Sequence, residues 1–144
     1  MNRSTLKTTL GLALGTLLAA GAVLAEDHSC NTHNVSGDWG YTSTGTRVGV
    51  GPVAAVGTFT LDRSGNVLDG KQTVSFNGTI ADETLSGTYT LNDDCTASAT
   101  VVVTSPIAPR TSHLDLVFVD GSDGVRMIFT DAGTILTVDG RKLN

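Results

Sequence analysis

The sequence predicts an all-β protein whose antiparallel, up-and-down strands, about eight in number, close into a barrel. Beyond residue 26, short runs of alternating apolar and polar residues are separated by turns rich in Gly, Asn and Asp, which is typical of strands and hairpins. The connections leave no room for the crossover helices that parallel strands require. A sequential antiparallel sheet also has two exposed edges, and closure into a barrel removes both. A two-sheet β-sandwich is the alternative architecture.

The individual strands follow from this alternation and from the turn residues between them. The run Gly57-Thr-Phe-Thr-Leu61 alternates cleanly, and Gly87-Thr-Tyr-Thr-Leu91 repeats it later in the chain. We interpret this echo as one hairpin solution used twice. Asn77-Gly78 is the strongest hairpin signal because both residues tolerate a positive φ. We expect strands over residues 35–41, 57–61, 67–76, 79–81, 85–91, 96–104, 112–119, 125–130 and 134–138.

The same alternation assigns side chains to the inside or the outside of the barrel. On the strand over residues 67–76 we expect Leu68, Val74 and Phe76 to face inward. Gln72 shares their parity, so its amide should lie inside as well. A buried amide needs partners, and Gln72 should therefore either bond to an interior tyrosine or orient a ligand.

The first 25 residues have the three-part order of a cleavable secretory signal. Arg3 and Lys7 make a basic start, and the following residues up to Leu24 carry no charge and are rich in Leu. Val23-Leu24-Ala25 then offers small residues at the cleavage site. A membrane anchor is the alternative, but the apolar run is shorter than the roughly 20 residues that a spanning helix needs.

Cleavage would divide the chain into a signal peptide, a leading segment and a barrel domain, over residues 1–25, 26–34 and 35–144. We expect a secreted or periplasmic protein with no membrane span once the signal is removed. Seven basic and fourteen acidic residues remain after cleavage, a net charge of −7. Such an acidic surface repels phosphates, which excludes nucleic acid as a partner. Asn34 and Asn77 head glycosylation sequons, which matter only in a eukaryotic host.

The two cysteines, Cys30 and Cys95, both follow the cleavage site, and we expect them to form a disulfide because thiols in an oxidising compartment usually pair. The bond would close a loop of about 66 residues, worth on the order of 4 kcal/mol in the chain-entropy treatment. It would join the leading segment to a turn in the middle of the barrel domain. A metal site of Cys30, His28 and His33 is the alternative, but Cys-x-x-His supplies too few ligands.

No catalytic constellation, cofactor motif or complete metal site stands out in the sequence. His113 should point outward beside Asp115, which is typical of a solvated surface pair, although it also matches the orienting half of a catalytic triad. The acidic turns at 93–94 and 120–123 offer oxygen ligands, but their spacing does not match a calcium loop. We therefore expect no cofactor and no metal.

One short motif resembles a known group of barrels. Gly37-x-Trp39 on the first strand, followed by a Gly- and Thr-rich meander, resembles the calycin group of lipocalins, fatty-acid-binding proteins and avidins. The basic pair Arg141-Lys142 is similar to the arginine that packs on this tryptophan in lipocalins. The further tryptophans of an avidin pocket are missing, so biotin is not an expected ligand. Residues 87–95 also resemble secreted bacterial proteins of this size, which implies a periplasmic or extracellular location.

Three functional hypotheses follow. The first is a non-catalytic secreted barrel that binds a small apolar ligand, with Trp39, Tyr41, Gln72 and Tyr89 as ligand-binding residues, Trp39 acting mainly as a core plug over one end. The second is an envelope or extracellular protein-interaction domain without a cavity, whose partner the sequence does not identify. The third is a barrel enzyme of the cyclase or isomerase type, which needs an apolar pocket and one or two polar groups. A cavity above roughly 300 Å³ favours a small-molecule site, and a packed interior favours the interaction domain.

Overall fold

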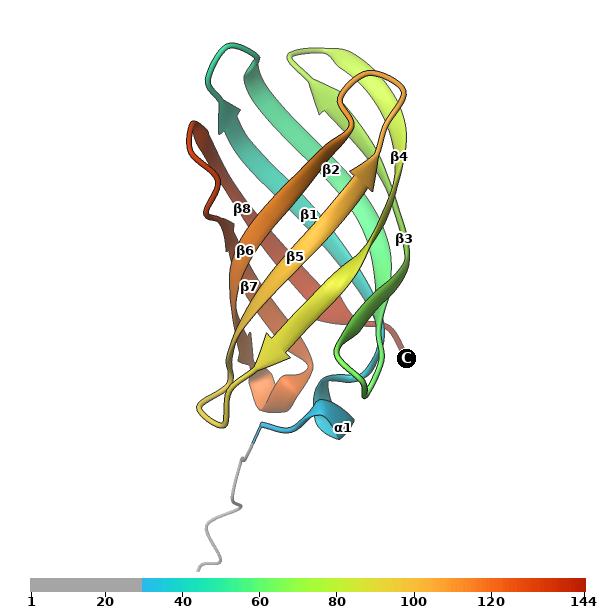
Figure 1. Ribbon diagram of the computed structural model, residues 1–144, viewed down its shortest axis with the longest axis vertical. Helices are drawn as coiled ribbons and strands as arrows, with labels where there is room; N and C mark the ends of the chain where they lie inside the picture. Colours follow the sequence, from blue (N-terminus) through green and yellow to red (C-terminus); the bar gives the residue numbers. More distant parts are fainter. Residues whose placement is uncertain (1–29) are drawn as a thin grey trace, which may run out of the picture.

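The computed structural model describes residues 30–144, so the predicted signal peptide and residues 26–29 of the leading segment lie outside the described residues. The described chain forms eight strands with two short helical segments (Figure 1). In chain order the elements are α1 (Thr32–Val35), β1 (Gly37–Arg47), β2 (Gly51–Leu61), β3 (Asn66–Phe76), β4 (Thr79–Leu91), β5 (Thr96–Thr104), β6 (Arg110–Val119), η1 (Asp120–Ser122), β7 (Gly124–Phe129) and β8 (Thr134–Lys142).

The strands form a closed antiparallel barrel in sequential order, as predicted. Each strand pairs with the next along the chain, and β8 pairs with β1 from Trp39 opposite Lys142 to Arg47 opposite Thr134. The sandwich alternative is therefore wrong. The two runs that we expected at 79–81 and 85–91 belong to one continuous strand, β4, which pairs with β3 along one part of its length and with β5 along another.

The interior is apolar and the exterior is rich in threonine, because each strand alternates between the two faces. On β5 the alternation is regular: Ala97, Ala99, Val101 and Val103 are buried, whereas every residue between them is exposed. The buried side chains of all strands form one large core cluster around Trp39 and a smaller one around Val74 and Phe76. The helical segments of the described chain are too short and polar to cross a membrane.

The predicted inward position of Leu68 is wrong. The register between β3 and β4 shifts between Val67 and Gly70, and Asp69 lies at a φ of +50° within this irregularity. An extra residue in one strand moves the side chains before it to the opposite face. Val67 is consequently buried and Leu68 is exposed, while Val74 and Phe76, beyond the irregularity, face inward as predicted.

The repeated sequence in β2 and β4 corresponds to a repeated hairpin. After β2 the chain turns through Asp62 to Gly65, and after β4 it turns through Asn92 to Cys95. In each turn the amide of the fourth residue donates to the carbonyl of the first, and that fourth residue has a positive φ, +86° at Gly65 and +69° at Cys95. The interpretation of one hairpin solution used twice is confirmed, with Cys95 standing where glycine stands in the other copy.

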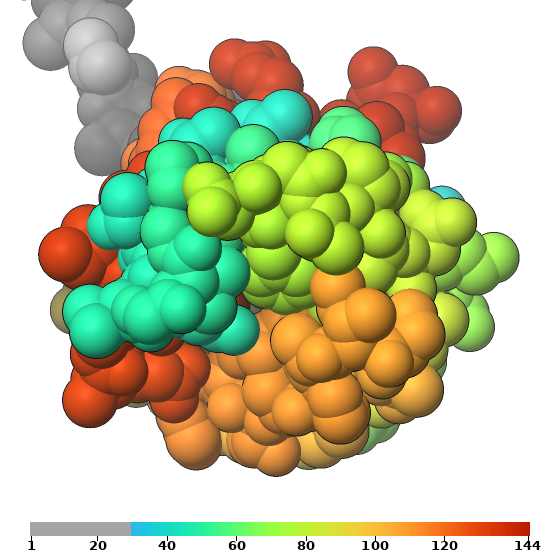
Figure 2. Space-filling model, turned by 90° about the horizontal axis from the view of Figure 1, so that it is seen from above, coloured from blue at the N-terminus to red at the C-terminus, as the bar shows by residue number. Residues whose placement is uncertain are grey.

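The two ends of the barrel differ. One end, called the base below, carries α1, the β2–β3 and β4–β5 turns and η1. The other, called the loop end, carries the hairpins that join β1 to β2, β3 to β4, β5 to β6 and β7 to β8. Seen from above, these hairpins crowd over the barrel axis and leave no wide opening on this face (Figure 2). The barrel thus carries both helical segments at the base and is narrowed by loops at the opposite end.

Candidate functional site

Trp39 closes the base of the barrel. Its side chain is fully buried, its indole nitrogen donates a 3.0 Å hydrogen bond to the carbonyl of Val35 in α1, and its ring packs against Phe59 and Phe118. Of the basic pair near the C-terminus, Lys142 lies over the indole, with Nζ 5.9 Å from the ring centroid. The ammonium is thus placed for a cation–π contact. Trp39 therefore occupies the position expected of a core plug.

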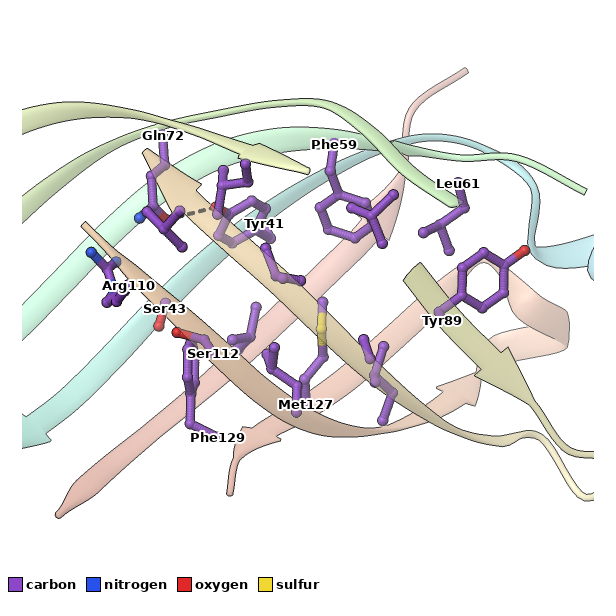
Figure 3. Close-up of a pocket in the computed structure, with 18 residues that line it drawn as sticks. Tyr41, Ser43, Phe59, Leu61, Gln72, Tyr89, Arg110, Ser112, Met127 and Phe129 are labelled. Atoms are coloured by element: carbon purple, nitrogen blue, oxygen red, sulfur yellow. Dashed lines mark hydrogen bonds between the residues drawn. The ribbon is translucent and has the colours of Figure 1, made fainter. Parts of the chain in front are cut away.

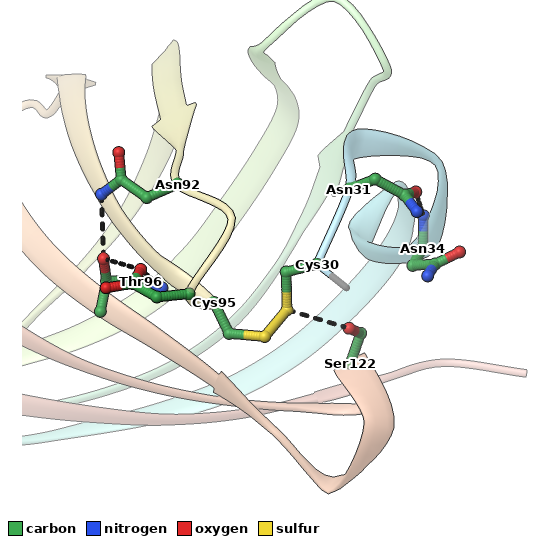
Figure 4. Close-up of a disulfide and its surroundings, with 8 residues drawn as sticks. Cys30, Asn31, Asn34, Asn92, Cys95, Thr96 and Ser122 are labelled. Atoms are coloured by element: carbon green, nitrogen blue, oxygen red, sulfur yellow. Dashed lines mark hydrogen bonds between the residues drawn. A yellow bond between two sulfur atoms is a disulfide. The ribbon is translucent and has the colours of Figure 1, made fainter. Parts of the chain in front are cut away.

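The disulfide links two segments of the chain at the base of the barrel. Cys30 and Cys95 are bonded, as predicted, which ties the segment before α1 to the β4–β5 turn (Figure 4). The sulfur of Cys30 also lies 3.8 Å from the hydroxyl of Ser122 in η1. Three pieces of the base that are distant in sequence therefore meet at one bond.

An interior cavity of about 80 Å³ lies between the base plug and the loop end (Figure 3). This volume is smaller than that of ordinary ligand pockets, roughly 300–1,000 Å³, and about half that of an engineered apolar cavity of roughly 150 Å³ that binds benzene. The interior is thus neither fully packed nor wide enough for a large ligand. Its apolar walls are Phe59, Leu61, Val67, Leu85, Ala99, Val101, Val103, Leu114, Leu116, Met127, Phe129 and Val138, and its polar side chains are Tyr41, Ser43, Gln72, Tyr89, Arg110 and Ser112.

Three of the four residues predicted to bind a ligand line this cavity. Tyr89 lies toward the base, where its hydroxyl donates a 2.6 Å hydrogen bond to the carbonyl of Asp62. Tyr41 and Gln72 lie nearer the loop end (Figure 3). Trp39 does not reach the cavity, because Phe59 and Tyr41 stand above it in the barrel. Ligand binding by these residues stays a prediction.

The polar residues near the loop end form a series of hydrogen bonds that runs from strand to strand inside the barrel. The hydroxyl of Tyr41 donates to Oε1 of Gln72 at 2.7 Å, and Nε2 of Gln72 donates to Oε2 of Glu83 at 2.5 Å. Arg110 then binds both oxygens of Glu83, at 2.8 and 2.9 Å. The interior tyrosine expected to satisfy Gln72 is therefore Tyr41. Both polar ends of the amide are occupied within the protein.

Gly57 makes this series of hydrogen bonds possible. It lies on β2 between Tyr41 and Gln72, opposite the former on β1 and the latter on β3. A Cβ at this position would lie 2.9 Å from the Tyr41 hydroxyl oxygen and 2.3 Å from the carbonyl oxygen of Lys71. Only glycine leaves the space in which the tyrosine reaches over β2 to the amide.

Glu83 is an ionised carboxylate inside the barrel. Its side chain has no solvent exposure. Burial raises its pKa, but hydrogen bonds from Arg110, Ser105 and Gln72 together with the Arg110 charge outweigh burial, so that the pKa lies below the ordinary value. The same surroundings act on Tyr41 in the other direction, because burial and the negative charge of Glu83 raise the pKa of the phenol. Tyr41 therefore stays protonated and acts as a hydrogen-bond donor.

A second guanidinium, that of Arg47, lies close to this ion pair. Arg47 ends β1 at the loop end and is half-buried. Burial first, and then the positive charge of Arg110, lower the pKa of Arg47, whereas Asp131 and Glu83 raise it. The loop end thus gathers two cations and two carboxylates around the top of the cavity.

Two buried polar atoms at the cavity have no hydrogen-bond partner among the described residues. They are Oγ of Ser112, whose residue is 1% exposed, and Nε of Arg110. The sequence interpretation missed both residues, and it also missed Glu83. Arg110 and Glu83 each fell in a gap between two predicted strands. Had 79–91 been taken as one strand, the parity of Glu83 with Leu85 would have placed it inside.

On the outer surface, His113 pairs with a different carboxylate from the one expected. Its Nδ1 lies 2.7 Å from Oδ1 of Asp131, and its backbone amide donates to Oδ2 of the same side chain. Asp115 was predicted as the partner, but it lies two positions along the same strand, whereas the β7–β8 turn brings Asp131 across to His113. The pair is partly solvent-exposed. Among residues 30–144, no group of three or more His, Cys, Asp or Glu side chains is placed to hold a metal ion.

The outer surface has exposed aliphatic side chains, but the strand pairing separates them by polar ones. Val56 lies between Thr42 and Thr73, and Ile128 lies between Asp115 and Thr137. Two further open hollows, of about 410 and 390 Å³, are lined by residues of β2, β3 and β4 and by residues near the β1–β2 and β3–β4 hairpins. Scattered aliphatic residues of this kind are ordinary on soluble proteins.

Comparison with known proteins adds no relative to this description: no protein-family model matches the chain, and no curated protein or solved structure matches it significantly.

Proposed function

We propose that the protein is an exported, non-catalytic barrel that holds a small, mostly apolar molecule in its interior cavity. The observation that carries this proposal is the cavity itself, which is walled by aliphatic and aromatic side chains, plugged at the base by Trp39 and edged with a few polar groups near the loop end. Concave apolar sites with a few convergent polar groups are the usual form of small-molecule sites.

The size of the cavity limits the ligand to a few non-hydrogen atoms. A volume of about 80 Å³ holds a compact molecule, whereas a longer ligand requires side chains such as Met127 or Phe129 to change rotamer. Methionine is the most adaptable of the wall residues because its side chain is unbranched and flexible. We therefore expect weak to moderate affinity for compact ligands.

Export and the calycin resemblance support the same proposal. The Cys30–Cys95 bond fits an oxidising compartment, and the three-part signal at the N-terminus directs the chain there. The Gly37-x-Trp39 motif leads into a closed eight-stranded barrel, an architecture compatible with a calycin-like binding protein. We place the protein in the periplasm or outside the cell.

The other two hypotheses have less support. A protein-interaction domain would present a continuous apolar patch, whereas exposed aliphatic side chains such as Val56 and Ile128 are flanked on the neighbouring strands by threonine and aspartate. A cyclase or isomerase would use Gln72 or Tyr89 on its substrate, and both side chains line the cavity. Their polar atoms are, however, already bonded to Tyr41, Glu83 and Asp62.

Met127 offers a direct test because it lines the cavity and Met1 is the only other methionine. The protein, purified with its disulfide intact, is labelled with ¹³C-methyl methionine and titrated with xenon and with 2-butanone. We expect a saturable shift of the Met127 methyl signal, assigned by its loss in M127L. Saturable binding requires that the cavity be large enough for the probe and that the probe can enter the interior in solution.

Neighbouring residues on β5 provide matched variants. Ala99 lines the cavity, and Ser98 points outward. A99L, with the smaller A99V as a second filling variant, should abolish or weaken the saturable shift, and S98L should leave it unchanged. The proposal is wrong if the wild-type signal never saturates, or if it responds equally in A99L, A99V and S98L.

A further inference from the structure

The polar atoms at the loop end of the cavity fall into two groups, those that the protein uses and those that it does not. Gln72 and Glu83 are fully engaged with each other, with Tyr41 and with Arg110. The hydroxyl of Ser112 and Nε of Arg110 have no partner among residues 30–144, although both atoms are buried. An unsatisfied buried polar group costs about 1–3 kcal/mol, so a ligand atom that bonds to it recovers free energy.

The two residues that carry the unused atoms are neighbours on the inner face of β6. Arg110 and Ser112 are two residues apart on β6, so both side chains face the interior, and both line the cavity. The buried Ser43 on β1 brings a further hydroxyl to the same end of the cavity (Figure 3). Within the cavity lining, therefore, the base end is mostly apolar, with the Tyr89 hydroxyl already bonded to Asp62, and the loop end presents hydroxyl groups and a guanidinium N–H.

The charges at this end favour an uncharged ligand group. The positive charge of Arg110 is already matched by Glu83 through both terminal nitrogens, and Nε is the guanidinium nitrogen that has no partner among residues 30–144. A ligand carboxylate would place a second negative charge beside buried Glu83, and like charges in an apolar site repel strongly. Arg47, the other cation nearby, does not line the cavity.

We infer that the cavity selects a compact apolar molecule bearing one uncharged hydrogen-bond acceptor, such as a ketone, aldehyde or ester carbonyl, and that Ser112 and Nε of Arg110 bind that oxygen. This inference rests on the proposed function, since it names the ligand class and the recognition groups of the same cavity. The apolar part of the ligand lies against Met127 and Leu114, and the oxygen points toward the loop end.

The experiment compares three probes with different polar groups: xenon, 2-butanone, and butyrate, which is ionised at pH 7. Affinities are taken from the Met127 methyl signal in wild type, S112A and the outward control S98A. We expect S112A to weaken 2-butanone binding about fivefold, the worth of one hydrogen bond of about 1 kcal/mol. Xenon affinity should not change, and S98A should behave as wild type. Butyrate should bind at least tenfold more weakly than 2-butanone.

A second measurement follows the ligand itself. The carbonyl carbon of bound ¹³C-labelled 2-butanone should lie further downfield in wild type than in S112A, because a ketone oxygen that accepts a hydrogen bond from Ser112 deshields this carbon. S112A should also fold at least as well as wild type, because it removes a buried hydroxyl that has no partner.

The outcomes separate this inference from the proposed function. Saturable xenon binding with unchanged 2-butanone affinity in S112A, or butyrate binding as tight as that of 2-butanone, would overturn the acceptor site while leaving a binding barrel. Failure of all three probes to bind wild type would overturn both.

Discussion

At the scale of single residues, Glu83 is the most costly side chain in the barrel to place. A carboxylate with no solvent exposure in an apolar interior is stable only because Arg110 meets both of its oxygens and Gln72 donates a further hydrogen bond. Removing either charge leaves the other buried without a counterpart. The pair therefore fixes the contact between β4 and β6 across β5 at the loop end.

The substitution E83Q should lower the free energy of unfolding by about 3–5 kcal/mol, because it leaves the Arg110 charge buried and unmatched. Urea titration monitored by circular dichroism measures the change. D139N is the matched control: Asp139 pairs with Arg126 on the exposed surface, where such a pair is worth less than about 1 kcal/mol. Similar losses in the two variants would contradict the structural role given to Glu83.

The same comparison has a defined pH dependence. The pKa of Glu83 is lowered in the folded protein, so its contribution is present in full above the unfolded-state pKa and is lost as the pH falls through the folded-state value. The stability difference between wild type and E83Q should therefore be constant near neutral pH and shrink once the pH falls below the ordinary glutamate value of 4.5.

At the scale of strands, a glycine decides where a side chain can reach over a neighbouring strand. Gly57 in β2 lets Tyr41 reach Gln72, and G57A would drive a Cβ to within 2.3 Å of the Lys71 carbonyl oxygen. We expect G57A to cost at least about 2 kcal/mol and to shift the Gln72 side-chain amide signals. The control is G40A on the neighbouring strand, where a Cβ would meet only the flexible side chain of Leu143.

G40A should stay within about 0.5 kcal/mol of wild type in the same urea titration, as expected of a substitution that the flexible Leu143 side chain can accommodate. If G57A were as mild as G40A, the backbone of β2 and β3 would have to separate without loss, and Gly57 would not be the residue that permits the Tyr41–Gln72 bond.

The elements show which features of the sequence predict structure and which do not. Alternation predicted the closed barrel and the inward face of β5, because side chains of a half-buried strand repeat every second residue. It failed at Leu68, because the irregularity at Asp69 reverses parity and the prediction treated residues 67–76, including Gly70, as one regular strand.

The candidate site was less predictable than the fold. The sequence named Tyr41, Gln72 and Tyr89 as candidates, Gln72 because it shares the parity of the inward side chains on its strand, and all three line the cavity. Glu83 and Arg110 were missed because both fell in gaps between predicted strands, and the burial of these charges is tolerable only because the two side chains form an ion pair between β4 and β6. Such long-range compensation is not visible in local periodicity.

At the scale of the whole molecule, the barrel combines a covalent fastening at the base with a noncovalent polar network near the loop end. Closure between β1 and β8 leaves no sheet edge, so the disulfide is not needed to complete the sheet. Its main effect is expected on the unfolded chain, where linking residues 65 positions apart removes conformational freedom. The folded barrel should therefore survive loss of the bond with reduced stability.

The test is the double variant C30A/C95G. Glycine is chosen at position 95 because that residue has a φ of +69°, where alanine would add backbone strain to the effect of the lost bond. We expect the free energy of unfolding to fall by about 4 kcal/mol, while the near-ultraviolet signal of buried Trp39 persists in native buffer. Wild type reduced with dithiothreitol should lose a similar amount. A variant as stable as the oxidised wild type would show that the bond does not restrict the unfolded chain, and loss of the Trp39 signal would show that it holds the base plug in place.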